Sequence, residues 1–165
     1  MSKESLGLLI RKLRKEKGFS YRGLEKEMKI LAIKLVMDES GDGVMGVMGD
    51  IRQQEVQGMS LDELNELYKS LDKKDKNAIS YVNIVHLENG RIETKRDVLV
   101  LLAKTLDYNE DSLLAEGDKL GSDVEEIINK KSDVVPAFLR STKHLTNEDW
   151  DELSKVVQKM NKKND

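Results

Sequence analysis

Two histidines and many carboxylates give this chain the side chains for acid–base or metal chemistry, but their spacing does not favour either. His86 and His144 lie in different predicted helices, and neither belongs to an HExxH pattern. No P-loop and no GxSxG serine motif occurs, and no dinucleotide-binding glycine motif follows a strand. We therefore expect a protein that is not an enzyme, with no catalytic residues and no cofactor.

One segment partly matches a calcium-binding loop. Asp38, Ser40, Asp42 and Gly43 match the first, third, fifth and sixth positions of an EF-hand loop. The twelfth position should supply a bidentate glutamate, but it is Gly49. We favour a glycine-rich loop and no metal ligands, and a calcium or small-ligand sensor stays open as a minor alternative.

The composition favours a helical protein. Of the 165 residues, 38% are hydrophobic and 36% are charged, which suffices for one domain or for a small domain with an accessory segment. With 1 proline and 11 glycines, helices are favoured over a turn-rich β sandwich. The absence of cysteine excludes disulfides and thiolate zinc sites. No apolar run reaches the ~18 residues that a membrane span needs, so we expect a cytoplasmic protein without membrane contacts.

Apolar residues recur at helical spacing along most of the chain, so we expect an all-α fold. Gly18 is placed to end a first helix, and Ser20 to cap a second that runs to about Met37. The stretch from Ile30 to Met37 also has the composition of a strand, and that alternative stays open. Further helix starts are predicted at Ser60, Ser80, Thr94, Pro136 and Thr146.

Positive charge is concentrated in two separated blocks. Residues 1–28 hold 8 lysines and arginines against 4 acidic residues, and residues 79–106 hold 4 against 3. The remainder of the chain is acidic, and the formal net charge is -3. If the two blocks meet in the fold, they form a cationic face that a polyanion would bind locally.

The same two blocks resemble the lambda-repressor-like (Xre-type) helix-turn-helix family. The resemblance covers Leu6–Met28 and Ile79–Leu114, about a third of the chain. It rests on the string ISYVNIVHLENG from Ile79 and on the string LAKTL that follows at a fixed distance. It implies that a short helix buries Ile84 and Leu87 and presents its other face to the major groove of double-stranded DNA.

The resemblance also implies roles for individual residues. Tyr81, Val82 and His86 occupy base-reading positions, whereas Asn89 and Arg91 match positions that contact the DNA backbone. The predicted DNA-binding set comprises Tyr21, Arg22, Ser80, Tyr81, Val82, Asn83, His86, Asn89 and Arg91. Arg14 and Glu88 stand where the family has a buried ion pair, for which the planar guanidinium of arginine is well suited.

The sequence departs from the family between the two central helices. Fifty residues, 29–78, separate segments that a tight turn normally joins, and Glu25 and Lys29 replace the expected small residue and turn glycine. Two placements of the second helix stay open. The first uses Ser20–Met28 and treats 29–78 as an insertion, and we prefer it because it keeps the usual spacing. The other uses Gly58–Leu71.

The C-terminal segment carries a second resemblance. Asp133–Ser141 followed by Leu145–Trp150 is similar to the C-terminal helices of phage and mobile-element repressors that a zinc metallopeptidase inactivates. It implies a metallopeptidase or another protein regulator as partner. Independently, the scarce aromatic residues Phe138 and Trp150 are expected to be buried against something, which favours a dimerisation or packing arm.

The sequence thus predicts a DNA-binding helix-turn-helix domain over 1–117, with the insertion 29–78, and a C-terminal helical arm over 118–165. We expect a sequence-specific transcriptional regulator, a repressor of phage or mobile-element genes that acts as a homodimer. The alternative is a protein-interaction module, such as an antitoxin, an antirepressor or a metallopeptidase-regulated partner, with little operator reading.

Overall fold

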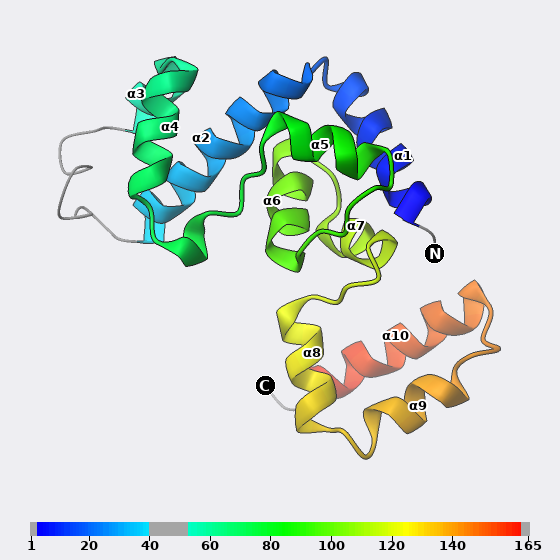
Figure 1. Ribbon diagram of the computed structural model, residues 1–165. Coiled ribbons are helices and arrows are strands. Elements are labelled where there is room, and N and C mark those ends of the chain that lie inside the picture. The colour runs from blue at the N-terminus through cyan, green and yellow to red at the C-terminus, as the bar shows by residue number, and fades with distance from the viewer. Residues whose placement is uncertain (1–2, 40–52, 163–165) are drawn as a thin grey trace. The chain divides into compact units, whose positions relative to one another are not determined.

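The computed structural model describes residues 3–39 and 53–162 of the chain. The described residues form helices and no strand, which confirms the all-α prediction (Figure 1). The helices divide into two compact units, Met1–Gly121 and Ser122–Asp165. This division lies a few residues after the boundary predicted at residue 117.

The first unit is built from seven α-helices and one short 3-10 turn within its described residues. They are α1 (Lys3–Glu16), α2 (Tyr21–Glu39), α3 (Gln53–Gly58), α4 (Leu61–Ser70), η1 (Lys73–Asp75), α5 (Tyr81–Glu88), α6 (Arg96–Leu106) and α7 (Glu110–Glu116). Helix α2 contacts α3, α4, α5 and α6, so it is the element around which the unit is assembled.

Helix α1 ends and α2 begins where the sequence predicted. Gly18 adopts φ +72°, a left-handed conformation that glycine takes without steric cost. The backbone N–H of Phe19 then bonds the carbonyl of Arg14 at 3.0 Å. The hydroxyl of Ser20 accepts the Gly23 N–H at 2.9 Å, which caps the start of α2.

The strand alternative for Ile30–Met37 is wrong, because α2 continues as a helix to Glu39. The physical reason is that this half of α2 is covered on two sides. Ala32 belongs to the main core, whereas Ile30 and Ile33 belong to a second cluster against α3 and α4. A helix buried on two sides has a nearly continuous apolar sequence, which resembles that of a buried strand.

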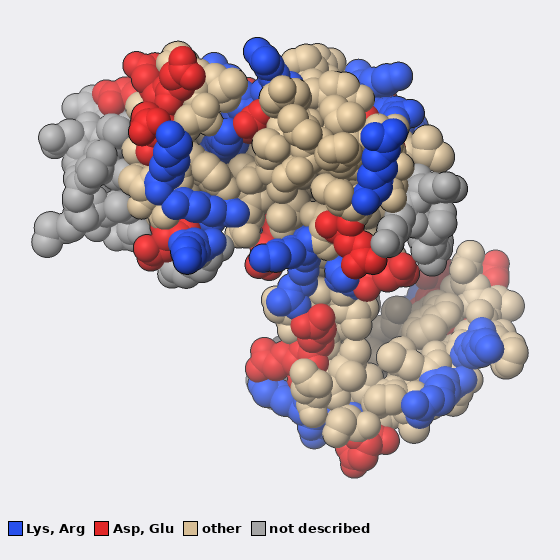
Figure 2. Space-filling model, in the orientation of Figure 1, with Lys and Arg blue, Asp and Glu red and all other residues tan. Residues whose placement is uncertain are grey.

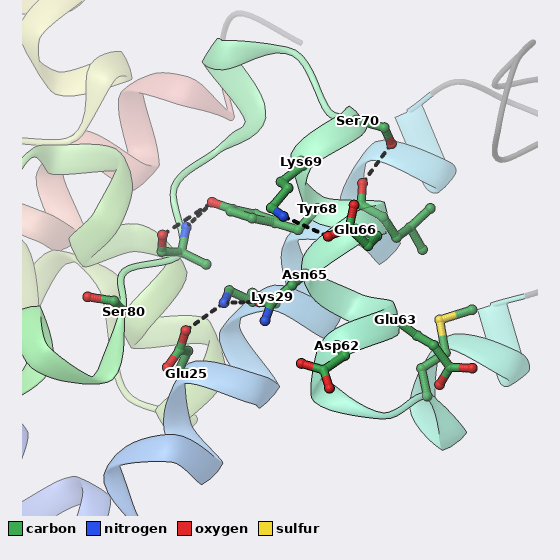
Figure 3. Close-up of a pocket in the computed structure, with 13 residues that line it drawn as sticks. Glu25, Lys29, Asp62, Glu63, Asn65, Glu66, Tyr68, Lys69, Ser70 and Ser80 are labelled. Atoms are coloured by element: carbon green, nitrogen blue, oxygen red, sulfur yellow. Dashed lines mark hydrogen bonds and ion pairs between the residues drawn. The ribbon is translucent and has the colours of Figure 1, made fainter.

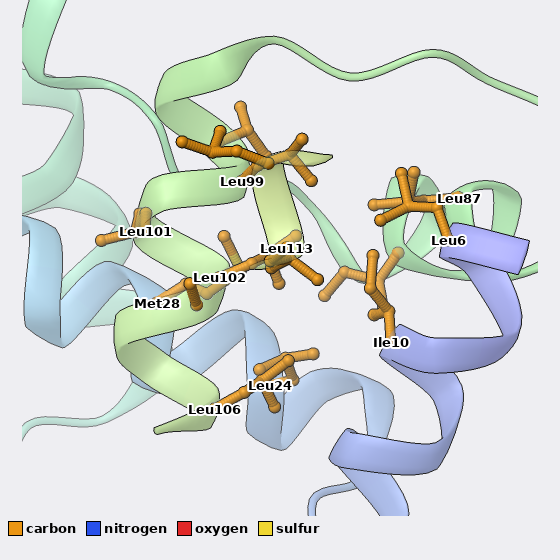
Figure 4. Close-up of a cluster of buried hydrophobic side chains, with 14 of the residues drawn as sticks. Leu6, Ile10, Leu24, Met28, Leu87, Leu99, Leu101, Leu102, Leu106 and Leu113 are labelled. Carbon is orange, nitrogen blue, oxygen red and sulfur yellow. The ribbon is translucent and has the colours of Figure 1, made fainter. Parts of the chain in front are cut away.

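The main core joins the two segments that the family resemblance covers. Figure 4 shows side chains of α1, α2, α5, α6 and α7 converging on one apolar centre. Each fully buried aliphatic side chain there contributes about 1.5–3 kcal/mol through removal of apolar surface from water. The large fully buried members are Ile10, Leu24, Met28, Ile84, Leu87, Leu99, Leu102, Leu106, Leu113 and Leu114.

The insertion has a small core of its own. Val56 of α3 and Leu64 of α4 are fully buried against Ile33 of α2. Helix α4 starts at the predicted capping box, in which Ser60 and Glu63 bond each other's backbone N–H groups. The sequence did not indicate α3, whose six residues, QQEVQG, are polar except for the buried valine.

The predicted start of α6 needs a correction. Ser80 caps α5 as predicted, and its hydroxyl accepts the Asn83 N–H. Thr94, however, does not cap α6. Lys95 takes the extended capping conformation instead, without a side-chain cap, and its carbonyl accepts the Leu99 N–H at 3.2 Å.

The second unit consists, in its described residues, of α8 (Ser122–Lys130), α9 (Val135–Ser141) and α10 (Asn147–Asn161). Pro136 lies in the first turn of α9, and Thr146 forms a capping box with Asp149 at the start of α10, both as predicted. Phe138 and Trp150 are 44% and 39% exposed, so their expected burial against another surface stays a prediction. Among the described residues of this unit, only Thr142 is buried.

Candidate nucleic-acid interface

The fold brings the two basic segments of the sequence into contact. Helices α1 and α2 come from the first segment, and both pack against α5 of the second. Met28 of α2 and Ile84 of α5 lie in the same core cluster, although the insertion separates them in the sequence. Helix α2 begins at Tyr21, three residues after Gly18, and it contacts α5.

Helix α5 has a buried stripe and an exposed stripe. Ile84 and Leu87 are buried, as predicted, and anchor the helix to the core. Tyr81 and Val82, in its first turn, are 40% and 44% exposed, and Asn83 is exposed beside them. The first turn of α5 therefore presents an aromatic hydroxyl, an amide and a methyl-bearing side chain, which are groups able to contact base edges.

Arg22 at the start of α2 lies next to this exposed turn. Its guanidinium carbon is 5.3 Å from the centre of the Tyr81 ring, within cation–π distance. Arg22 is exposed and forms no ion pair with another described residue. The contact thus places an available cation at the N-terminal end of α5, where it suits a phosphate.

The other end of α5 carries the remaining predicted residues. Arg91 is exposed, and its backbone N–H bonds the His86 carbonyl at 2.9 Å. The Asn89 amide is engaged within the protein, because it donates to the Val85 carbonyl and accepts from Arg11, both at 2.7 Å. His86 itself is half-buried, so its imidazole is less accessible than Tyr81.

Arg14 and Glu88 form the ion pair that the sequence predicted. Arg14 Nε lies 2.6 Å from Glu88 Oε1, and Arg14 Nη2 lies 3.0 Å from Oε2, in a buried two-point contact. This hydrogen bonding raises the pKa of the Arg14 guanidinium above its usual value. Arg11 Nε adds a contact of 3.3 Å to Glu88 Oε2, so α1 holds the C-terminal end of α5.

Tyr21 is half-buried and contacts this ion pair. Its hydroxyl donates to Glu88 Oε2 at 3.2 Å, and its ring lies 4.0 Å from the Arg14 guanidinium carbon. The family resemblance places a DNA-contacting residue at this position. In this chain the Tyr21 hydroxyl supports the contact between α1, α2 and α5, and a DNA contact of this half-buried residue stays a prediction.

Sequence reasoning missed the roles of Glu25 and Lys29 at the opposite end of α5. Both are buried and bonded to each other at 2.5 Å. Glu25 Oε2 also accepts the backbone N–H of Tyr81 at 3.0 Å. The available signal was an oppositely charged pair at i and i+4 directly beside the buried Leu24 and Met28.

A groove lies beside the N-terminal end of α5 and separates it from α4. Its volume is about 1280 Å³, with Leu67 and Tyr68 among its apolar lining and Asp62, Glu63 and Glu66 among its acidic lining. Figure 2 shows acidic side chains gathered over α3 and α4, whereas the surface over α5 is largely uncharged in that view. The interface region is therefore neutral to basic, with an acidic border on the insertion side.

Two further properties concern metals and membranes. Across residues 3–39 and 53–162, no group of three or more histidines and carboxylates is placed to hold a metal ion. Most of the calcium-like loop, from Ser40 to Gly49, lies outside the described residues. None of the described helices combines the length and the apolar character needed to cross a bilayer.

Comparisons of the chain with protein-family models, with curated proteins and with solved structures returned no match.

Proposed function

We propose that the protein is a sequence-specific DNA-binding transcriptional regulator of the helix-turn-helix type, a cytoplasmic repressor of phage or mobile-element genes. The observation that carries this proposal is the first turn of α5. It exposes Tyr81, Val82 and Asn83 together, beside the exposed guanidinium of Arg22. Both ends of the helix are held by buried carboxylates, so these side chains stand on a fixed support.

In the proposed mechanism, α5 enters the major groove with its N-terminal turn first. Tyr81 and Asn83 hydrogen-bond base edges, and Val82 contacts a thymine methyl group. Arg22 and Arg91, on either side, bind phosphates and set the register without reading sequence. Repression follows by occlusion, because a bound protein covers promoter DNA.

The second unit supports action as a dimer. Large hydrophobic residues on all three of its helices are exposed, among them Ile127, Phe138 and Trp150. Of the described residues in this unit, only Thr142 is buried. An exposed apolar surface of this kind is typical of a protein–protein interface. A second copy of the chain is the expected partner, because two-fold symmetric DNA-binding proteins bind paired half-sites.

A protein-interaction module remains the second candidate, and the groove beside α5 favours it. An apolar lining with Asp62, Glu63 and Glu66 at its edge would suit a basic segment of another protein, such as a metallopeptidase or an antirepressor. Retention of a partner encoded by a neighbouring gene, without retention of DNA, would select this alternative.

Footprinting of the gene's own upstream region, followed by titration of the protected fragment, tests the DNA-binding proposal. The wild-type protein should bind this fragment at least tenfold more tightly than unrelated DNA, and binding should weaken with salt. Tyr81→Ala should lose about tenfold on the protected fragment, the cost of one base contact. Equal affinity for both DNAs would overturn sequence-specific binding.

A matched pair of variants separates phosphate binding from general charge. Arg22→Ala should weaken binding to both DNAs and reduce the slope of log affinity against log salt by about one unit. Lys104→Ala removes an exposed cation from α6 and should leave both quantities unchanged. If the two substitutions changed DNA affinity and its salt dependence equally, Arg22 would not belong to the DNA interface.

A further inference from the structure

The insertion is joined to α5 by a chain of buried polar contacts. Lys29 Nζ lies 2.5 Å from Glu25 Oε1 and donates to Asn65 Oδ1 of α4 at 2.6 Å (Figure 3). Glu25 and Lys29 are only 7% and 8% exposed. A charged pair at this depth is tolerated because each member has a partner, and Asn65 of the insertion supplies one of them.

Glu25 extends this chain to the first residue of α5. Its second oxygen, Oε2, accepts the Tyr81 N–H at 3.0 Å. A carboxylate at a helix N-terminus also interacts favourably with the helix dipole. The Ser80 hydroxyl accepts the N–H of Asn83, three residues later. The turn that carries the proposed base-reading residues is thus held by acceptors from two different elements.

A second tie fixes the chain segment that leads into α5. The Tyr68 hydroxyl of α4 accepts the Ala78 N–H at 2.8 Å and donates to the Ala78 carbonyl at 3.2 Å. The Tyr68 ring also lies 5.9 Å from Lys29 Nζ, which connects the two ties. Figure 3 shows both sets of contacts on the same side of α4, facing α2 and the entry to α5.

From this geometry we infer that the insertion is a specificity element: Asn65 and Lys29 orient Glu25, and Glu25 is a positioning residue that fixes the first turn of α5. This inference rests on the proposed function, because it assigns α5 the task of reading bases. Hydrogen bonds to base edges depend steeply on position, whereas attraction to phosphates does not. Loss of the contact should therefore reduce specific binding more than non-specific binding.

The test compares wild type with Glu25→Ala, Glu25→Gln and Asn65→Ala by two readouts. The first is the ratio of affinities for the protected DNA and for unrelated DNA. The second is hydrogen exchange of the Tyr81 amide by nuclear magnetic resonance, with the Asn83 amide as internal reference. Glu66→Gln is the control, because Glu66 lines the same groove but pairs with Lys69 on the surface.

We expect Glu25→Ala to lower the affinity ratio about tenfold and to speed Tyr81 exchange by a similar factor, with little change for Asn83. Glu25→Gln keeps an acceptor oxygen and should recover much of both losses. Asn65→Ala leaves the Glu25–Lys29 pair in place and should give a smaller change in the same direction. Glu66→Gln should match wild type in both readouts.

The outcomes separate this inference from the proposed function. If wild type shows no preference for any DNA, the proposed function fails, and Tyr81 exchange in Glu25→Ala still tests whether Glu25 fixes the helix start. Unchanged exchange and an unchanged affinity ratio in Glu25→Ala would overturn the positioning role. If Glu25→Ala does not fold, Asn65→Ala and Glu25→Gln decide by the same two readouts.

Discussion

The carboxylate of Glu88 fixes the C-terminal end of α5 through side chains from two other helices. Arg14 and Arg11 reach it from α1, and the Tyr21 hydroxyl reaches it from α2. Because Glu88 is 2% exposed, each of these donors replaces water that the carboxylate lost on burial. The Glu88 carboxylate therefore holds α1, α2 and α5 together.

Arg14→Ala should destabilise the first unit strongly. The substitution leaves the Glu88 carboxylate buried without its two-point partner, which costs about 3–5 kcal/mol for ion pairs of this kind. Denaturant unfolding monitored by circular dichroism measures the change. Lys12→Ala removes an exposed i, i+4 contact with Glu16 on the same helix and should cost less than about 0.5 kcal/mol. Equal stability of the two variants would contradict this assignment.

Sequence reasoning identified this pair but not the one at the other end of α5. The pair of Arg14 and Glu88 could be predicted because the family resemblance assigns these two residues to each other. Glu25 and Lys29 have no counterpart in that pattern, and their partner Asn65 belongs to the insertion. A contact between segments 36 residues apart leaves no periodic signal, so it could be found only when the fold was known.

At the scale of elements, α1 and α5 cross so closely that only glycine fits at one position. A Cβ added to Gly7 would lie 2.7 Å from the carbonyl oxygens of Leu87 and Glu88. These are backbone atoms at the end of α5, so they cannot move aside as a flexible side chain would. The close crossing brings α1 near enough for Arg14 to reach Glu88.

Gly7→Ala should therefore destabilise the first unit by about 1–3 kcal/mol, because the added methyl group forces the two helices apart. In an exposed helix the same change would stabilise the protein, since alanine has the higher helix propensity. Gly58→Ala is a suitable control, because no atom lies within 4 Å of a Cβ added there. Unfolding midpoints of the two variants give the comparison, and a Gly7→Ala variant at least as stable as wild type would refute the close crossing.

The capping box at the start of α10 should make this helix sensitive to acid. Hydrogen bonds from the Thr146 backbone N–H and hydroxyl lower the pKa of the Asp149 carboxyl below its usual value. A lowered folded-state pKa means that the charged form favours folding. The resulting stability is present above the unfolded pKa of about 3.9 and is lost as the pH falls through the folded value.

Asp149→Asn should remove this part of the acid dependence, so its helix content should change less than that of wild type between about pH 5 and pH 2. Circular dichroism over that range provides the measurement. Glu148→Gln removes the neighbouring carboxylate, which is not the capping residue, and should retain the wild-type profile. Superimposable acid profiles for Asp149→Asn and wild type would show that the cap carries no charge-dependent stability.

Elements with a local signal were predictable, and elements defined by tertiary contacts were not. Ser60, Ser80 and Thr146 carry their capping information in the next few residues, and all three helix starts were placed correctly. Helix α3 is short and polar, and its single buried residue, Val56, gives no periodicity. The continuation of α2 to Glu39 depends on two clusters that cover opposite faces, which a single sequence does not reveal.

At the scale of the whole molecule, the two units differ in how many of their hydrophobic side chains they bury. The first unit encloses two hydrophobic clusters, whereas no hydrophobic side chain in the described part of the second unit is buried. A segment of this size that buries so little does not reach independent stability. We therefore expect the second unit to complete its core against a second copy of the chain, which the proposed binding to paired half-sites also requires.

Val157→Lys and Gln158→Lys test this expectation as a matched pair. Both residues are exposed neighbours on α10, but only Val157 belongs to the exposed hydrophobic set, at 48% exposure. A lysine at position 157 would place an unpaired charge in the proposed interface, whereas position 158 is already polar. Sedimentation equilibrium at micromolar concentration should show a dimer for wild type and for Gln158→Lys, and a monomer for Val157→Lys. If wild type is a monomer under these conditions, the second unit does not pair with itself, and the expectation of a dimer is wrong.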